Sequence, residues 1–141
     1  MPTRRAQAEW TGDLKGGRGT MALGSGAYEG AYSFGSRFEE AAGTNPEELI
    51  GAALAGCFSM ALAAALGRAG HDPQSVATKA KVHLEKVGDA FAVTRIELDT
   101  EARVPGIDDD AFQETAAGAK EGCPVSKALA GVEITLDARL A

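Results

Sequence analysis

The sequence predicts one α+β domain over residues 1–141, in which an antiparallel sheet is wrapped around a central apolar helix. Segments that alternate apolar and polar residues, as half-buried strands do, lie on both sides of an uncharged segment at 49–66. With 141 residues, 45% apolar and 24% charged, the chain has the size and composition of one globular domain with a real core.

Three strands are expected in the first third of the chain. Residues 6–10 alternate, a second strand is expected over 18–23, and a third from 31 to 34 or beyond. Glycine-rich turn segments separate these strands. Because glycine is so frequent here, the sequence leaves the strand registers open.

A helix start is marked at Asn45, which can cap the helix, followed by Pro46 at the first helical position and Glu48 three residues after the cap. The helix is expected to end near Gly67 or Gly70. It is apolar on all faces, which predicts burial on all faces. Its uncharged segment reaches the length of a membrane span. However, it is rich in alanine and has no aromatic belt at its ends, so a buried central helix is the better interpretation.

The second half of the chain predicts three strands and two helices. Gly88 and Asp89 form a hairpin turn, and the apolar parity of the strand after it shifts near Thr94 and Arg95, which indicates a bulge. The expected elements are strands at 76–85, 91–104 and 132–140, a helix at 108–120, and a short helix from 124 to 129.

The charge of the chain limits its partners. A net charge of -6 and a pI near 4.9 argue against a nucleic-acid surface and against binding to anionic membranes. The N-terminal segment has no apolar signal core, so a cytoplasmic location is expected. In a reducing cytosol, two cysteines are more often chemical or incidental than a structural crosslink.

The two cysteines differ in their local sequence. Cys57 lies deep in the apolar helix, where a free cysteine is most often a small core residue. Cys123 precedes Pro124 and sits at the start of a short helix, where backbone N–H groups favour a thiolate. A plain loop cysteine is about as common at such a position.

Other polar candidates are weaker. The spacing of His71 and His83 with the two cysteines matches no zinc pattern, and no cofactor or metal is expected. Glu47, in the first turn of the central helix, can be explained by compensation of the helix dipole alone. A cysteine hydrolase would need a histidine base, and neither histidine is well placed in the sequence to be one.

Six segments, which together extend over nearly the whole chain, are distinctive: AEWTG at 8–12, RFEE at 37–40, GTNPEELIGAA at 43–53, CFSMAL at 57–62, VPGID at 104–108 and EGCPVS at 121–126. With these segments the chain resembles the OsmC/Ohr family of osmotically inducible and organic hydroperoxide resistance proteins. It leans toward the osmotically inducible branch, because Arg37 stands close before the central helix. Gly56 is a small departure, since relatives often carry alanine there.

The resemblance implies a thiol-dependent peroxidase that acts on organic hydroperoxides and less readily on hydrogen peroxide, in stress defence. It implies a peroxidatic Cys57, a resolving Cys123 that closes a disulfide with it, and an Arg37–Glu47 pair that supports the thiolate. An arginine about 4 Å from the sulfur would lower the pKa of Cys57 by up to roughly three units. The reductant would be a dithiol, with lipoyl-type compounds as candidates. An intertwined homodimer is also implied.

Helix geometry favours the same homodimer. Glu47 and Cys57 are ten residues apart, or about 15 Å along one helix, so a single arginine does not bridge them easily within one chain. Two such helices packed antiparallel would bring Glu47 of one near Cys57 of the other. The alternative function is a stress-induced small-molecule binding protein without turnover, in which Cys57 is only a core residue.

Overall fold

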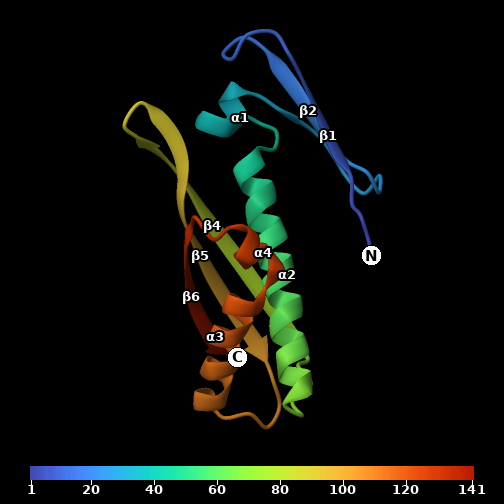
Figure 1. Cartoon of the computed structure of the whole chain (residues 1–141), viewed down its shortest axis with the longest axis vertical. Coiled ribbons are helices and arrows are strands. Elements are labelled where there is room, and N and C mark those ends of the chain that lie inside the picture. The colour runs from blue at the N-terminus through green and yellow to red at the C-terminus, as the bar shows by residue number, and fades with distance from the viewer. The chain divides into compact units, whose positions relative to one another are not determined.

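The computed structural model describes all 141 residues and divides into two compact units, Met1–Leu49 and Ile50–Ala141. The first unit holds a three-stranded antiparallel sheet in the order β1-β2-β3 (Figure 1). Its strands are β1 (Ala6–Thr11), β2 (Arg18–Leu23) and β3 (Glu29–Tyr32). The first two strands lie where the sequence predicts them.

The third strand ends earlier than expected, because a short helix, α1 (Phe34–Phe38), begins directly after it. The Ser33 hydroxyl accepts a hydrogen bond from the Ser36 amide at 3.0 Å, and the Ser36 hydroxyl accepts one from the Ser33 amide at 2.8 Å. This reciprocal capping satisfies the first backbone donors of the helix and turns the chain away from the sheet.

The long helix α2 (Pro46–Arg68) begins as predicted. Asn45 caps it, because its side-chain oxygen accepts a hydrogen bond from the Glu48 amide at 2.7 Å. The chain leaves the helix through Gly70, whose φ of +85° is a left-handed conformation that glycine adopts without strain.

The second unit is built on a three-stranded sheet in the order β4-β5-β6. Strands β4 (Ser75–Val87) and β5 (Ala90–Arg103) form an antiparallel hairpin. His83 pairs with Arg95 and the next residue of β4 pairs with Val93, so Thr94 is the extra residue of a bulge. The predicted bulge is therefore confirmed.

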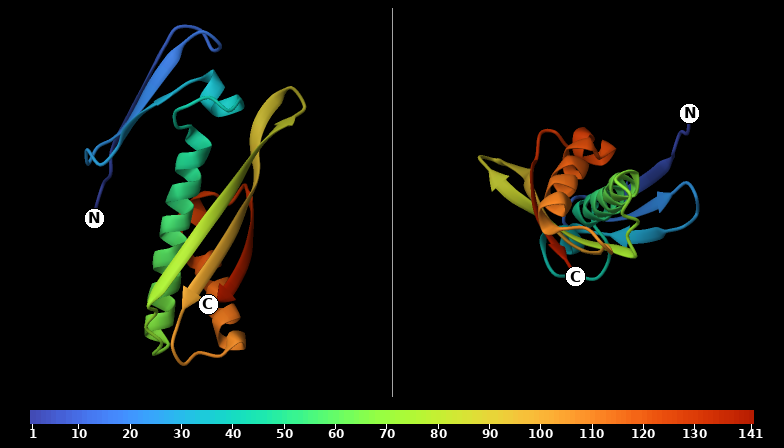
Figure 2. Two further views of the ribbon diagram at one scale, coloured as in Figure 1. Left: turned by 180° about the vertical axis from the view of Figure 1, so that it is seen from behind. Right: turned by 90° about the horizontal axis from the view of Figure 1, so that it is seen from below.

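Strand β6 (Glu133–Leu140) pairs with β5 in parallel, which corrects the expectation of a wholly antiparallel sheet. The connection runs through α3 (Asp109–Gly122) and α4 (Pro124–Ala128). A helical crossover of this length brings the chain back to start β6 at the same end as β5, which a short hairpin cannot do. Helices α2, α3 and α4 lie on one face of this sheet (Figures 1 and 2).

The core of the second unit lies between this sheet face and the helices. Strand β5 turns alternate residues inward, and α2 contributes a row spaced by four residues. A chain of hydroxyl groups joins the helix to the sheet, from Ser59 to Thr78 at 2.8 Å and from Thr78 to Thr100 at 2.9 Å. Among the fully buried apolar residues are Leu54, Phe58, Leu62 and Leu66 of α2, Ile96, Leu98 and Ala102 of β5, and Phe112 and Ala116 of α3.

The opposite face of α2 is not covered within one chain. Met60 is 76% exposed, and the residues beside it on that face are small: Ala52, Ala53, Gly56 and Ala64. A single chain therefore leaves uncovered part of the helix surface whose burial the sequence predicts. By length and composition α2 could also cross a membrane, which is weak evidence because core helices of soluble proteins share those properties.

Candidate active site

Cys57 is placed at the edge of the core by its position on α2. The neighbouring Phe58 is fully buried and the preceding Gly56 is exposed, so the helix face that carries Cys57 is turned halfway between core and surface. Cys57 is accordingly half-buried, and it packs against the core cluster. The sulfur is thus neither sealed in the interior nor free in solvent.

Cys123 lies at the junction of two helices, where it ends α3 and precedes α4. Its amide donates to the Ala119 carbonyl at 3.0 Å as the last bond of α3, and Pro124 occupies the first position of α4. A proline is suited to that position because the missing N–H would have no helical partner there. Cys123 has extended backbone angles, φ -61° and ψ 124°, and its side chain is fully buried.

The junction points the Cys123 sulfur at Cys57. The Cys123 and Cys57 sulfurs are in hydrogen-bond contact at 2.7 Å, and both cysteines are free. A disulfide has its sulfurs about 2.05 Å apart, so once one sulfur is oxidised only a small movement is needed to close the bond. The structure therefore brings together the two cysteines that the sequence singled out, although 66 residues separate them.

The surroundings treat the two thiols differently. Burial raises the pKa of the Cys57 thiol, and the hydrogen bond with Cys123 raises it further. Burial also raises the pKa of the Cys123 thiol, but the bond with Cys57, the amides of Val125 and Ser126, and the Ser126 hydroxyl together hold it below its usual range. The groups of this unit thus favour a thiolate at Cys123 over one at Cys57.

Arg37 and Glu47 form a two-pronged ion pair within the first unit. The Arg37 Nε donates to Glu47 Oε1 and an Nη donates to Oε2, each at 3.0 Å. The Glu47 side chain is 10% exposed and that of Arg37 is 37% exposed. This parallel geometry fixes the guanidinium plane and leaves other donors of the arginine open, as an anion-stabilising group requires.

The loop between α1 and α2 holds this pair in place. The Ser36 hydroxyl donates to the Thr44 carbonyl at 2.7 Å, and the Asn45 amide group donates to the Ser36 carbonyl at 3.0 Å. These bonds fix the last turn of α1, which carries Arg37, against the first turn of α2, which carries Glu47. The second pair singled out by the sequence is thus also brought together.

The histidines lie outside both pairs. His83 is on the polar side of the β4–β5 hairpin, where its Nε2 lies 2.5 Å from a Glu97 oxygen. His71 follows the end of α2, and its amide donates to the Leu66 carbonyl at 2.9 Å. Neither is among the groups that act on the two sulfurs.

Sequence reasoning missed Ser126, whose hydroxyl and amide both act on Cys123. The signal was present, since Ser126 stands three residues after Cys123, which is the spacing of a capping pair.

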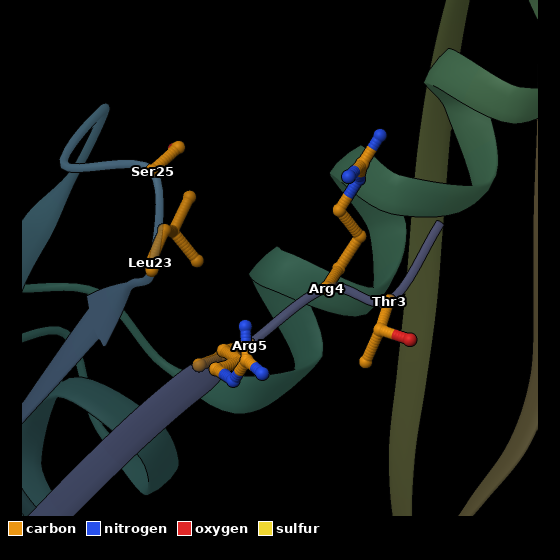
Figure 3. A pocket seen from close by; sticks show the side chains of 7 residues that line it. Thr3, Arg4, Arg5, Leu23 and Ser25 are labelled. Atoms are coloured by element: carbon orange, nitrogen blue, oxygen red, sulfur yellow. The ribbon is translucent and has the colours of Figure 1, made fainter. Parts of the chain in front are cut away.

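A separate hollow of about 620 Å³ lies in the first unit, beside the start of β1 and the end of β2 (Figure 3). Arg4, Arg5, Leu23 and Ser25 are among the residues that line it, and both arginines are exposed. It contains no cysteine and no carboxylate. It therefore lacks the groups that distinguish the sulfur site.

Fold and site together define a protein with two adjacent free thiols, one on the central helix α2 and one between the crossover helices α3 and α4. Such a pair can pass between dithiol and disulfide. The chain belongs to the OsmC family: the family described as OsmC-like protein matches residues 39–137.

Individual relatives agree with this assignment. The chain is 52% identical over 138 residues to the Peroxiredoxin OsmC of Escherichia coli (strain K12), which covers 97% of this chain and 96% of the relative. Among solved structures, an OsmC-like protein from Mycoplasma pneumoniae has a TM-score of 0.76 at 14% identity, covering 99% of this chain and 98% of that one. An organic hydroperoxide resistance protein from Elizabethkingia anophelis has a TM-score of 0.71 at 25% identity, covering 100% and 96%.

Proposed function

We propose that the protein is a cysteine-based peroxidase that reduces organic hydroperoxides, and hydrogen peroxide less readily, in defence against peroxide stress. The observation that carries this proposal is the contact of two free thiols, Cys57 and Cys123, at 2.7 Å. Family membership supports it, because the relative with 52% identity over nearly the whole chain is named a peroxiredoxin. The whole chain would act as one catalytic domain.

The proposed reaction oxidises Cys57 and then condenses it with Cys123. The Cys57 thiolate attacks the outer oxygen of the hydroperoxide, the O–O bond breaks, and a sulfenic acid forms on Cys57 while the alkoxide leaves and takes up a proton to become the alcohol. The Cys123 thiolate then attacks that sulfur, the S–O bond breaks, and the oxygen leaves as water after taking up a proton. An external dithiol returns two electrons and two protons; lipoyl-type compounds are the proposed class of reductant.

Exposure supports giving the first step to Cys57. Cys57 is half-buried, whereas Cys123 is fully buried, so a peroxide reaches the Cys57 sulfur more readily. The attacking sulfur must be a thiolate, yet burial raises the pKa of Cys57. The proposal therefore needs a positive charge near this sulfur, and Arg37, held by Glu47, is the proposed source.

We place this arginine across a homodimer interface. The uncovered apolar face of α2 supports a second copy as its partner, since a helix with two apolar faces is stable when both are buried. Glu47 and Cys57 are separated by a rise of about 15 Å along α2. This distance supports an arrangement in which the Arg37–Glu47 pair of one chain lies near Cys57 of the other. A cytoplasmic location belongs to the same proposal.

Peroxide consumption by single-cysteine variants tests the reaction. Cys57→Ser should abolish turnover of an organic hydroperoxide in the presence of a dithiol. Cys123→Ser should still consume one equivalent and leave a sulfenic acid that a thiol-specific reagent traps. The reverse pattern would exchange the two roles, and no peroxide consumption by the wild-type protein with any dithiol would favour a binding protein instead.

Mixed dimers test the shared site. Chains with Cys57→Ser and chains with Arg37→Met should each be inactive. If Arg37 acts across the interface, one site of each mixed dimer is intact, and refolding the two together restores about a quarter of wild-type activity. If no activity returns, Arg37 acts within its own chain and the shared site is wrong, while the peroxidase assignment stands.

A further inference from the structure

Ser126 on α4 has a buried hydroxyl without a hydrogen-bond partner. It is the one such side-chain oxygen or nitrogen in the structure. Buried hydroxyls are nearly always paired, because an unpaired one has lost its water without gaining another bond. An unpaired hydroxyl beside a reactive sulfur therefore suggests a partner that is present in another chemical state.

The position of Ser126 identifies that partner as Cys123. Cys123 precedes α4 as its cap residue and Ser126 is the third residue of the helix, so both lie on the same side of its first turn. In a reciprocal capping pair, the Ser126 hydroxyl would accept from the Cys123 amide, but that amide is already bonded to Ala119 at 3.0 Å. The Cys123 sulfur is thus the group that remains as a hydrogen-bond partner for the Ser126 hydroxyl.

The Cys123 side chain makes no capping hydrogen bond at the start of α4, and its sulfur contacts the Cys57 sulfur at 2.7 Å. The groups that act on the sulfur are the Cys57 thiol of α2 and, from α4, the amides of Val125 and Ser126 and the Ser126 hydroxyl. Each of the three groups from α4 favours the negative form of the sulfur.

We propose that Ser126 is a positioning residue whose hydroxyl donates a hydrogen bond to the Cys123 thiolate whenever that thiolate forms. The inference rests on the proposed peroxidase function, in which this thiolate appears twice in each cycle. In the thiol state the hydroxyl has no partner; once the proton leaves Cys123, a short rotation of the hydroxyl supplies a charge-assisted bond.

The first appearance of the thiolate precedes the closing of the disulfide. The Cys123 thiolate attacks the Cys57 sulfenic acid, the S–S bond forms, the S–O bond breaks, and hydroxide leaves and takes up a proton to become water. A lower pKa raises the fraction of Cys123 that is ready to attack at neutral pH.

The second appearance follows reduction of the disulfide. Cys123 is 0% exposed, so the thiolate of an external dithiol reaches the Cys57 sulfur. A mixed disulfide then forms at Cys57, the original S–S bond breaks, and its electron pair leaves on Cys123. A leaving thiol of lower pKa departs faster, so the Ser126 hydroxyl speeds this step as well.

The pKa of Cys123, measured in a Cys57→Ala chain, tests this inference without any peroxide. The ultraviolet absorbance of the thiolate is followed against pH. Adding Ser126→Ala should raise the pKa of Cys123 by about one unit, which is the effect of losing one bond to a charged acceptor. Ser126→Thr retains a hydroxyl and should keep the pKa closer to that of the parent chain.

The matched control is Thr115→Ala, which removes a half-buried hydroxyl from α3 that is bonded to the Ala111 carbonyl at 2.7 Å. It should leave the pKa of Cys123 unchanged. An unchanged pKa in Ser126→Ala, or equal shifts for Ala and Thr at this position, would overturn the inference. Failure of peroxide turnover in the wild type would instead overturn the proposed function, since the titration does not depend on it.

A second measurement covers the reductive step in the chain with both cysteines. The disulfide is formed beforehand and reduced with a dithiol in a single turnover, and the mixed disulfide is trapped and located by peptide mapping. Ser126→Ala should reduce more slowly than the wild type, with the reductant attached to Cys57. Attachment to Cys123, or an unchanged rate, would contradict the proposed role.

Discussion

A substitution at Gly56 on α2 tests whether this face of the helix is free or is covered by a partner. In the single chain, a Cβ added to Gly56 would meet no atom within 4 Å beyond its own stretch of helix. Glycine inside a helix is less favourable than alanine by about 0.5–1 kcal/mol, and leucine is nearly as good a helix former as alanine. For an isolated chain, Gly56→Leu should therefore raise the free energy of unfolding by about 0.5–1 kcal/mol and the Tm by about 2–4 °C.

If a partner helix covers this face, Gly56→Leu should lower the free energy of unfolding instead of raising it. Gly56 lies among the small side chains that would let two α2 helices approach closely, and a leucine would have to fit into that contact. Forcing extra methylene groups into a packed interface costs about 1–3 kcal/mol, which exceeds the gain in helix propensity. We expect Gly56→Leu to lower the Tm and to weaken the dimer.

Gly118 on α3 provides the matched control, because it is also a helical glycine at which an added Cβ would meet no atom within 4 Å beyond its own stretch of helix. Gly118→Leu should show the gain expected for an open helix position. Thermal unfolding and sedimentation equilibrium at several protein concentrations measure both quantities. If Gly56→Leu stabilises as Gly118→Leu does and the wild-type protein sediments as a monomer, the interface argument is refuted.

Three further predictions concern stability. Leu62→Ala should lower the free energy of unfolding by about 2–5 kcal/mol, because Leu62 is fully buried and a cavity remains; a loss under 1 kcal/mol in urea unfolding would contradict this. The hydrogen bond from His83 holds the pKa of Glu97 below its ordinary value of 4.5, so this pair stabilises the fold above about pH 4.5, and its contribution is lost as the pH falls through the lowered pKa. His83→Ala should therefore lower the free energy of unfolding near neutral pH and change it little at low pH. An equal loss at both pH values would contradict the link between the Glu97 pKa and stability. Glu47→Gln should cost roughly 1 kcal/mol, less than a buried charged bond, because Arg37 is 37% exposed; circular dichroism during guanidinium unfolding checks this, with a neutral effect as the contrary result.

Elements with a strong local pattern could be predicted from the sequence. The cap of α2 at Asn45 and the bulge at Thr94 both follow from residues within a few positions of the feature. Helix α1 was missed because its capping pair, Ser33 and Ser36, lies in a glycine-rich segment with no clear period. The parallel pairing of β6 was missed because strand direction depends on the course of the crossover, which alternation of residues does not record.

In the candidate site, too, some features could be predicted from the sequence and others could not. The resemblance implied a pairing of Cys57 with Cys123 and of Arg37 with Glu47, and the structure brings each pair together. The unpaired state of the Ser126 hydroxyl could not be inferred, because a missing hydrogen bond is a property of the whole neighbourhood. The same holds for the uncovered face of α2, since a uniformly apolar sequence gives no sign of which face the chain itself buries.

The different surroundings of the two thiols bear on how one chain could support both half-reactions. A resolving thiol does not need contact with the peroxide, so Cys123 can be fully buried and still act, provided that local amides and a hydroxyl favour its thiolate. The proposed attacking thiol, Cys57, does need that contact, and its half-buried position leaves part of it open to solvent, although burial raises its pKa. A chain without an added positive charge would then attack peroxide slowly while closing its disulfide readily. The slow step would be the attack of Cys57 on the peroxide, and this is the step that the proposed Arg37 of a second chain would accelerate. Formation of the homodimer would therefore set the rate of peroxide reduction.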